Sequence, residues 1–200
     1  MTTNFAKNVS HAPTRQATFL CCSVRCLSGN SPEMLEPHAS SPAIDPRVRI
    51  GHVHLKVSDL EKSLAFYCGV LGFELMQRWG TQVAFISAGG YHHHIGLNTW
   101  ESLAGSPPPA GSTGLFHLAI LYPDRATLGD AARRLLAAKV PLDGASDHGV
   151  SEALYLRDPD QNGLELYRDR PKEEWSRNPD GSIAMFTRPL DLDALVREAR

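Results

Sequence analysis

Two histidines and one glutamate stand on apolar, strand-like segments that lie far apart in the sequence. His52 alternates with the apolar residues of its segment, and His117 occupies a matching position 65 residues later. Glu165 lies between Leu164 and Leu166, so in a strand its carboxylate points away from that apolar pair. A carboxylate facing a cavity is costly unless it is paired or bound to a metal. Two imidazoles and one carboxylate are the set that holds Fe(II) or Mn(II) with open coordination positions.

Taken singly, these residues also have ordinary structural explanations. A histidine on a strand is more often a satisfied core or surface group than a ligand, so the metal site depends on the three residues together. The run His92-His93-His94 is also explained as a surface cluster that binds metal only adventitiously. His148 is explained as a residue that caps a loop, and Tyr155 as a core aromatic.

The elements that would position these residues are predicted to occur twice in the same order. Setting 52–59 over 117–124 places His52 on His117 and Asp59 on Asp124. A capping box at 58–61 starts the first helix, and Gly72 ends it. The second helix is predicted over 125–138, and the segment with His148 is predicted to be a loop. Alternation predicts strands over 49–57, 73–79, 83–87, 92–99, 152–157 and 164–168. The sequence therefore indicates an α+β fold of two β-α-β-β-β modules, at 48–102 and 113–170.

Composition narrows the classes of function. The chain has 200 residues, of which 42% are hydrophobic and 21% charged, and these are ordinary globular values. A net charge of -2 leaves no basic excess for a nucleic acid. No apolar run approaches the roughly 18 residues of a membrane-spanning helix. No Cys-x-x-Cys spacing occurs, and we expect the protein to function in a reducing compartment. From the charge and the absence of a long apolar run, we expect no nucleic-acid or membrane partner, and a small-molecule substrate.

The two ends of the chain differ from this central domain, predicted over 47–170. Residues 1–46 are expected to form a disordered tail, because 1–32 contain no Asp or Glu and are rich in Ser and Thr. An acid-poor tail is also typical of organelle import, which is the alternative to a cytoplasmic location. Residues 171–200 are expected to form an extension, with a turn at 178–181 and a short helix at 191–199.

Four motifs together resemble the vicinal oxygen chelate superfamily, which includes glyoxalase I, bleomycin- and fosfomycin-resistance proteins and extradiol dioxygenases. They are Gly-His-Val-His-Leu-Lys-Val at 51–57, Ser-Asp-Leu-Glu-x-Ser-Leu-x-Phe-Tyr at 58–67, Phe-His-Leu-Ala-Ile at 116–120, and Leu-x-Asp-Pro-Asp-x-Asn-Gly-Leu-Glu-Leu-Tyr at 156–167. The resemblance covers 48–170. It implies paired modules that form a half-open barrel around a divalent metal, with ligands at His52, His117 and Glu165.

Within this superfamily the sequence is most similar to catechol 2,3-dioxygenase-like proteins. In extradiol enzymes an active-site tyrosine stands ten residues before the ligand glutamate, as Tyr155 does here. The resemblance also implies substrate binding by His148 and a third active-site histidine in the run 92–94. Alternation favours His94 for that role and leaves His93 as the alternative. The sequence departs from the family pattern in having two modules where catechol-cleaving relatives commonly have four, and in Gln161, which replaces a usual glycine.

The resemblance implies an Fe(II)-dependent dioxygenase that acts on a catechol or related vicinal diol with O₂. Mn(II), Zn(II) and Ni(II) are the alternative metals. Glyoxalase I-type isomerases carry a fourth, carboxylate ligand on the last strand of the first module, but residues 81–100 contain no acidic residue. A glyoxalase-type isomerase or lyase and a drug-binding protein of the same fold remain the alternatives. A homodimer fits each of them, because two-module members of the family often pair.

Overall fold

The computed structural model describes residues 43–200, so nearly all of the expected tail lies outside the described residues. The chain divides into two units, 1–47 and 48–200, and the second unit holds all the helices and strands described below. Residues 43–50 form no helix or strand and are exposed. Within the described residues, no helix has the length and apolar character needed to cross a membrane.

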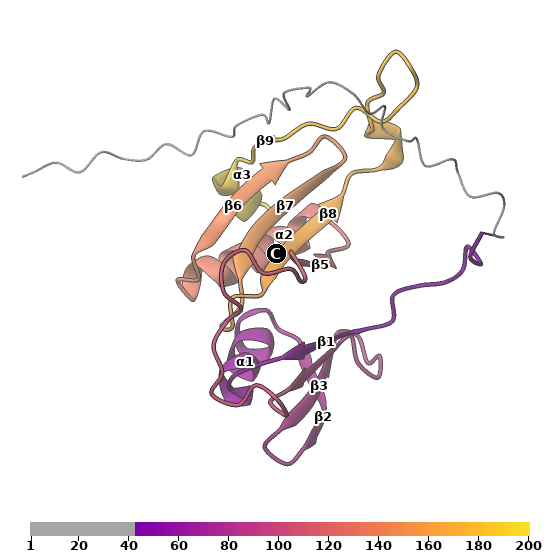
Figure 1. The fold of residues 1–200 in the computed structure, drawn as a ribbon. Coiled ribbons are helices and arrows are strands. Elements are labelled where there is room, and N and C mark those ends of the chain that lie inside the picture. The colour runs from indigo at the N-terminus through magenta and orange to yellow at the C-terminus, as the bar shows by residue number, and fades with distance from the viewer. Residues whose placement is uncertain (1–42) are drawn as a thin grey trace, which may run out of the picture. The chain divides into compact units, whose positions relative to one another are not determined.

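The first module contains one helical segment and one sheet (Figure 1). Its elements are β1 (Val53–Lys56), α1 (Leu60–Leu64), the π-helix η1 (Ala65–Val70), β2 (Glu74–Trp79), β3 (Val83–Ser87) and β4 (Ile95–Asn98). The strand order is β1-β4-β3-β2, and β1 runs parallel to β4 while the other pairs are antiparallel. The helical segment ends at Gly72, whose φ of 90° is unfavourable for other residues.

The second module repeats this arrangement. Its elements are β5 (Leu118–Leu121), α2 (Arg125–Ala137), β6 (Leu142–Asp147), β7 (Ser151–Arg157) and β8 (Gly163–Asp169). The C-terminal extension adds η2 (Lys172–Glu174), β9 (Arg188–Pro189) and α3 (Leu192–Arg197). The sheet order is β5-β8-β7-β6-β9, again with one parallel pair, β5 and β8. The predicted α+β fold of two β-α-β-β-β modules is therefore confirmed, and its two sheets are not closed into a full barrel.

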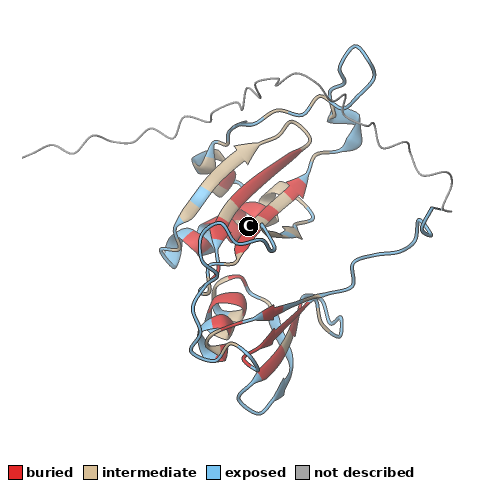
Figure 2. Cartoon of the chain, viewed as in Figure 1, coloured by how far each residue is buried: buried red, intermediate tan, exposed pale blue. Residues whose placement is uncertain are grey.

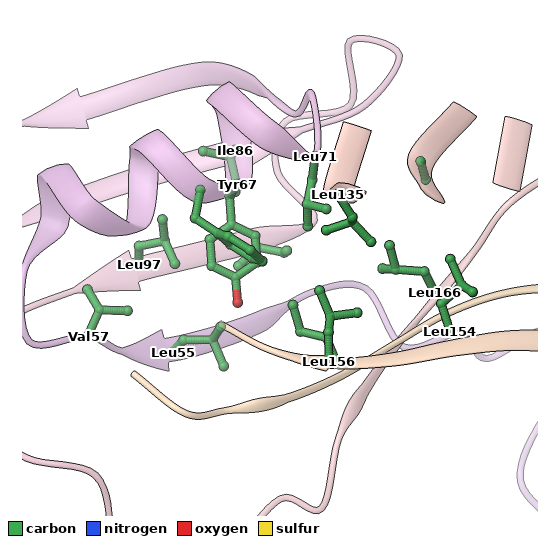
Figure 3. Packing of buried hydrophobic residues seen from close by; sticks show 14 of the residues in the cluster. Leu55, Val57, Tyr67, Leu71, Ile86, Leu97, Leu135, Leu154, Leu156 and Leu166 are labelled. Carbon is green, nitrogen blue, oxygen red and sulfur yellow. The ribbon is translucent and has the colours of Figure 1, made fainter. Parts of the chain in front are cut away.

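A single apolar cluster is shared by both modules. Leu55 and Leu97 line the helix side of the first sheet, whereas Leu154 and Leu166 line that of the second. Figure 3 shows Tyr67 among these buried leucines. Figure 2 shows that β3, β4, β7 and β8 are largely buried, whereas β2 is exposed along its whole length. In β8 the buried leucines alternate with the half-buried Glu165 and Tyr167, so the other face of the second sheet can carry polar side chains.

Two hydrogen bonds join the modules through residues of the sequence motifs. The hydroxyl of Tyr67 donates to Asp158 Oδ2 over 2.9 Å, and both residues are buried. The backbone N–H of Ser58 donates to Asp160 Oδ1 over 3.0 Å. The Asp-Pro-Asp turn thus anchors the first helix to the hairpin of β7 and β8, which explains why the carboxylate of Asp158 is buried there.

Two local predictions were wrong. The first helix is capped by Asp59, whose side chain accepts from the backbone N–H of Glu61 and Lys62, and not by Ser58, whose N–H is used between the modules. His148 lies in the loop between β6 and β7, as predicted, but residues 142–147 just before it form strand β6 and do not belong to that loop. The residues of β6, Leu-Asp-Gly-Ala-Ser-Asp, have weak strand propensity and a register shift, so pairing with β7 and β9 decides their conformation.

Candidate functional site

The second sheet places predicted site residues on its open face. Glu165 lies directly opposite Tyr155 on β7 and opposite Ala119 on β5. Residues that lie opposite each other in a sheet project from the same face, so Tyr155 and Glu165 share the side away from the leucine core. His117 stands two residues before Ala119 and belongs to the same face.

A glycine brings His117 close to β8. A Cβ built on Gly163 would lie 2.1 Å from the carbonyl oxygen of Phe116 and 3.1 Å from the Cβ of His117. The first contact is far too short for any side chain, so only glycine allows the two backbones this approach. Gly163 therefore sets the position of His117 beside Glu165.

Glu165 contacts a different residue through each carboxylate oxygen. Oε2 lies 3.0 Å from Nε2 of His117, and Oε1 accepts a 3.0 Å hydrogen bond from the hydroxyl of Tyr155. The exposed fractions of the His117 and Glu165 side chains are 30% and 15%, so the pair is reachable from solvent. Burial, and then the hydrogen bond to Glu165, raise the pKa of Tyr155 to about 12. Tyr155 therefore remains a hydroxyl donor at neutral pH.

His148 extends this group beyond Tyr155. Its Nε2 lies 2.9 Å from the Tyr155 hydroxyl, and its Nδ1 lies 3.0 Å from the carbonyl oxygen of Phe186. We call His117, Glu165, Tyr155 and His148 the site quartet. It forms a continuous series of polar contacts across β5, β8, β7 and the end of β6, which can bind a cation at one end and move a proton at the other.

His117 and Glu165 fit a divalent metal as neighbouring ligands. Metal bonds of about 2.1 Å at right angles would separate the two donor atoms by roughly 3.0 Å, which matches their spacing. Nδ1 of His117 is buried and has no hydrogen-bond partner. Within residues 43–200 it is the only buried side-chain nitrogen or oxygen of which this is true. An ion held by Nε2 would not satisfy this second ring nitrogen, so the fit to a metal rests on the spacing between Nε2 and Oε2.

The structure places the other predicted histidines on the first module. The ring centroid of His52 lies 4.5 Å from that of His93, and His93 Nδ1 lies 2.8 Å from His92 Nδ1. His94 Nδ1 lies 2.9 Å from the hydroxyl of Ser87. β4 begins only at Ile95, so the predicted strand alternation does not apply to the histidine run.

His52 is not grouped with His117 and Glu165 in this structure. Among residues 43–200, no three His, Cys, Asp or Glu side chains lie close enough together to hold one metal ion. Burial, and then the neighbouring imidazoles with His52 first, lower the pKa of His93. The neutral imidazole that a metal requires is thereby favoured at His93.

Sequence reasoning missed the contribution of the C-terminal extension. The carbonyl of Phe186 and the hydroxyl of Thr187, 3.2 Å from Nδ1 of His148, both lie beyond the motifs. No sequence signal could have found the first contact, because every residue has a backbone carbonyl. Sequence reasoning also overlooked an aromatic series on the open face of the first sheet, where His54 contacts both Phe85 and Trp100.

Three curated proteins are similar to this chain in sequence. Catechol-2,3-dioxygenase of Bacillus subtilis (strain 168) is 42% identical over 157 residues, which are 78% of this chain and 54% of that protein. Biphenyl-2,3-diol 1,2-dioxygenase 2 of Rhodococcus globerulus is 32% identical over 128 residues, 60% of this chain and 63% of that protein. A probable lactoylglutathione lyase of Synechocystis sp. (strain ATCC 27184 / PCC 6803 / Kazusa) is 26% identical, covering 62% of this chain and 97% of that protein. The chain thus spans only about half to two thirds of the two dioxygenases.

Solved structures support the same fold. A glyoxalase/dioxygenase from Nostoc punctiforme superposes with a TM-score of 0.54 at 21% identity, over 66% of this chain and all of that one. A glyoxylase/bleomycin resistance protein/dioxygenase domain from Frankia sp. EAN1pec gives a TM-score of 0.53 at 23% identity, over 62% and 94% of the two chains. Residues 49–166 match the family model directly. The chain therefore belongs to the Glyoxalase/Bleomycin resistance protein/Dioxygenase superfamily.

Proposed function

We propose that this chain is a metal-dependent extradiol-type dioxygenase that acts on a catechol or a related vicinal diol. The observation that carries the proposal is the site quartet. In it, the Glu165 carboxylate contacts His117, its proposed partner in metal binding, through one oxygen, and Tyr155, which is paired with His148, through the other. The names of the two dioxygenase relatives support it. Because the chain spans only part of those proteins, its activity and its substrate are both proposals.

His117 and Glu165 would hold the ion, with Fe(II) as the first choice and Mn(II), Zn(II) or Ni(II) as alternatives. When bound, a divalent metal supplies Lewis acidity and a template for the diol and O₂. His52 is the proposed third ligand. Since His52 packs on His93 here, ligation by His52 requires that it leave this contact, or that a second copy of the chain supply it.

The remaining site residues would handle protons and hydrogen bonds. Tyr155 keeps its proton at neutral pH, so its hydroxyl can donate to a substrate oxygen. His148 Nε2 faces that hydroxyl and can accept a proton from the substrate through it. His94 is the proposed third active-site histidine, although its Nδ1 contacts Ser87 on the first module.

Glyoxalase-type isomerisation is the second candidate, and similarity to the lactoylglutathione lyase supports it. That reaction needs a base on the last strand of the first module, which is β4 in this fold. The open face of β4 presents Gly96 opposite His54 and Asn98 opposite Lys56, and neither residue is acidic. A drug-binding role without turnover is the third candidate, and it requires no metal pair.

A substrate experiment separates these candidates. The full chain is reconstituted anaerobically with Fe(II) and given a panel of catechols while O₂ uptake is recorded. A parallel assay uses methylglyoxal and a thiol with Ni(II) or Zn(II). Catechol-dependent O₂ uptake that is lost in Tyr155→Phe and His148→Ala supports the proposal. Isomerase turnover without O₂ uptake overturns it, as does tight binding of a hydrophobic cation by the metal-free chain without turnover in either assay.

A metal titration tests the ligands separately. We expect stoichiometric binding in the wild type, its loss in His117→Ala and Glu165→Ala, and its retention in His54→Ala, which removes an imidazole outside the proposed ligand set. Full occupancy in either of the first two variants would exclude the pair. If a second copy supplies His52, a mixture of His52→Ala and His117→Ala chains should recover occupancy that neither variant has alone.

A further inference from the structure

The C-terminal extension returns to the site along the edge of the second sheet. We call residues 183–190 the C-terminal strap. Arg188 and Pro189 pair with Asp147 and Ser146 of β6, and the N–H of Leu190 donates to the carbonyl of Ala145 over 3.1 Å. This strap lies beyond residues 49–166, the stretch that matches the family model, and it is placed beside His148.

Phe186 is held in place from two sides. A Cβ built on Gly149, whose φ is 78°, would lie 2.6 Å from the Phe186 ring, so the ring occupies the space that a side chain at this position would need. The guanidinium of Arg188 lies 4.3 Å from the ring centroid, within the range of a cation–π contact. The N–H of Phe186 also donates to the carbonyl of His148 over 3.3 Å. The Phe186 carbonyl is thus fixed at Nδ1 of His148.

This contact determines where His148 carries its proton. A backbone carbonyl only accepts hydrogen bonds, so Nδ1 at 3.0 Å must be protonated to make the bond. In the neutral imidazole Nε2 then carries no proton, so it can only accept from the Tyr155 hydroxyl at 2.9 Å, whose single proton is donated either to Nε2 or to Oε1 of Glu165. The Thr187 hydroxyl at 3.2 Å can accept or donate, and so it does not select either form.

We infer that Phe186 is a positioning residue that fixes neutral His148 in the tautomer with its proton on Nδ1. His148 can then exchange a proton with Tyr155 only through Nε2. The Tyr155 hydroxyl lies between Nε2 of His148 and Oε1 of Glu165, so one proton serves either neighbour. This inference rests on the proposed function for its catalytic consequence. The tautomer itself follows from the contact between Nδ1 and the Phe186 carbonyl.

The tautomer is measured directly, without substrate or metal. Long-range proton–nitrogen spectra of the ¹⁵N-labelled full chain are recorded at about pH 8.5, where an ordinary imidazole is neutral. The His148 signals are assigned from their absence in His148→Asn. We expect the pattern of a protonated Nδ1 and a bare Nε2 in the wild type. A proton on Nε2 would overturn the inference.

Strap variants test the role of Phe186. Phe186→Ala removes the ring that seats the carbonyl, so the Nδ1–H pattern should be lost. Phe186→Leu should largely retain it. Met185→Ala, an exposed change in the same strap, and Thr187→Val should leave it intact. Unchanged signals of the other histidines confirm folding, and Gly149→Ala provides a second route to displacing the ring. The positioning role of Phe186 is refuted if the Nδ1–H pattern of His148 survives in both Phe186→Ala and Gly149→Ala. It is also refuted if Thr187→Val alone abolishes that pattern.

Activity provides a separate result. If catechol cleavage is found, Phe186→Ala should lower kcat about 10-fold or more with metal content and KM unchanged, since a positioned proton-transfer group contributes about 10²- to 10⁴-fold. An unchanged kcat would contradict the catalytic consequence. Absence of any cleavage by the wild type would refute the proposed function and leave the tautomer result standing.

Discussion

Replacing Tyr67 by phenylalanine removes one hydroxyl from the junction between the modules. Tyr67 is fully buried, and its hydroxyl donates to Asp158, which is 2% exposed. Asp158 also accepts from the backbone N–H of Asp160 and Asn162 and from the Asn162 side chain. The change therefore removes one of four hydrogen bonds and does not leave the carboxylate without partners.

The expected loss follows from these contacts. A hydrogen bond to a charged group contributes about 1.5–3 kcal/mol, and the three remaining donors favour the lower half of that range. We therefore expect the free energy of unfolding to fall by about 2 kcal/mol. For a domain of this size the corresponding fall in Tm is about 4–8 °C.

Urea unfolding of Tyr67→Phe, followed by circular dichroism, measures the change. The matched control is Tyr122→Phe, because the half-buried Tyr122 hydroxyl makes no hydrogen bond within residues 43–200. The metal content of Tyr67→Phe should equal that of the wild type, since Tyr67 lies outside the site quartet. If the two variants unfold within about 0.5 kcal/mol of each other, the proposed connection between the modules does not stabilise the fold.

Three further changes have defined outcomes. The fold raises the pKa of Tyr155 to about 12 and so stabilises its protonated form. This contribution to the free energy of unfolding is complete below about pH 10 and is lost as the pH rises through about 12. The difference in phenolate absorbance between the metal-free wild type and Tyr155→Phe should therefore appear only near pH 12 and not near pH 10. Gly163→Ala should displace His117 and weaken metal binding at least about tenfold, as measured by titration, whereas Gly69→Ala, with no atom within 4 Å of the added Cβ, should bind normally. Gln161→Gly should raise the free energy of unfolding by about 1 kcal/mol in urea, because Gln161 has a φ of 67°; a loss of stability would contradict the strain.

Local patterns in the sequence were sufficient to predict the modules and part of the site. Strand alternation follows from backbone geometry, so it correctly turned Glu165 away from Leu164 and Leu166. The resemblance to extradiol enzymes, in which an active-site tyrosine stands ten residues before the ligand glutamate, implied that Tyr155 and Glu165 belong together, and they are register partners. The repeat predicted the order of elements, because strand alternation and helical spacing recur in the same order in both halves of the domain.

Tertiary structure alone decided the remaining contacts. β6 forms because β7 and β9 pair with it, although its residues are poor strand formers. The partner of Tyr67 is 91 residues away, and that of His148 is a backbone carbonyl 38 residues away, so no local period encodes either one. His52 and His117 match in the repeat, yet the structure packs His52 on His93. A repeat specifies which face of a sheet a side chain occupies, whereas the packing between sheets or between copies of the chain specifies what that face meets.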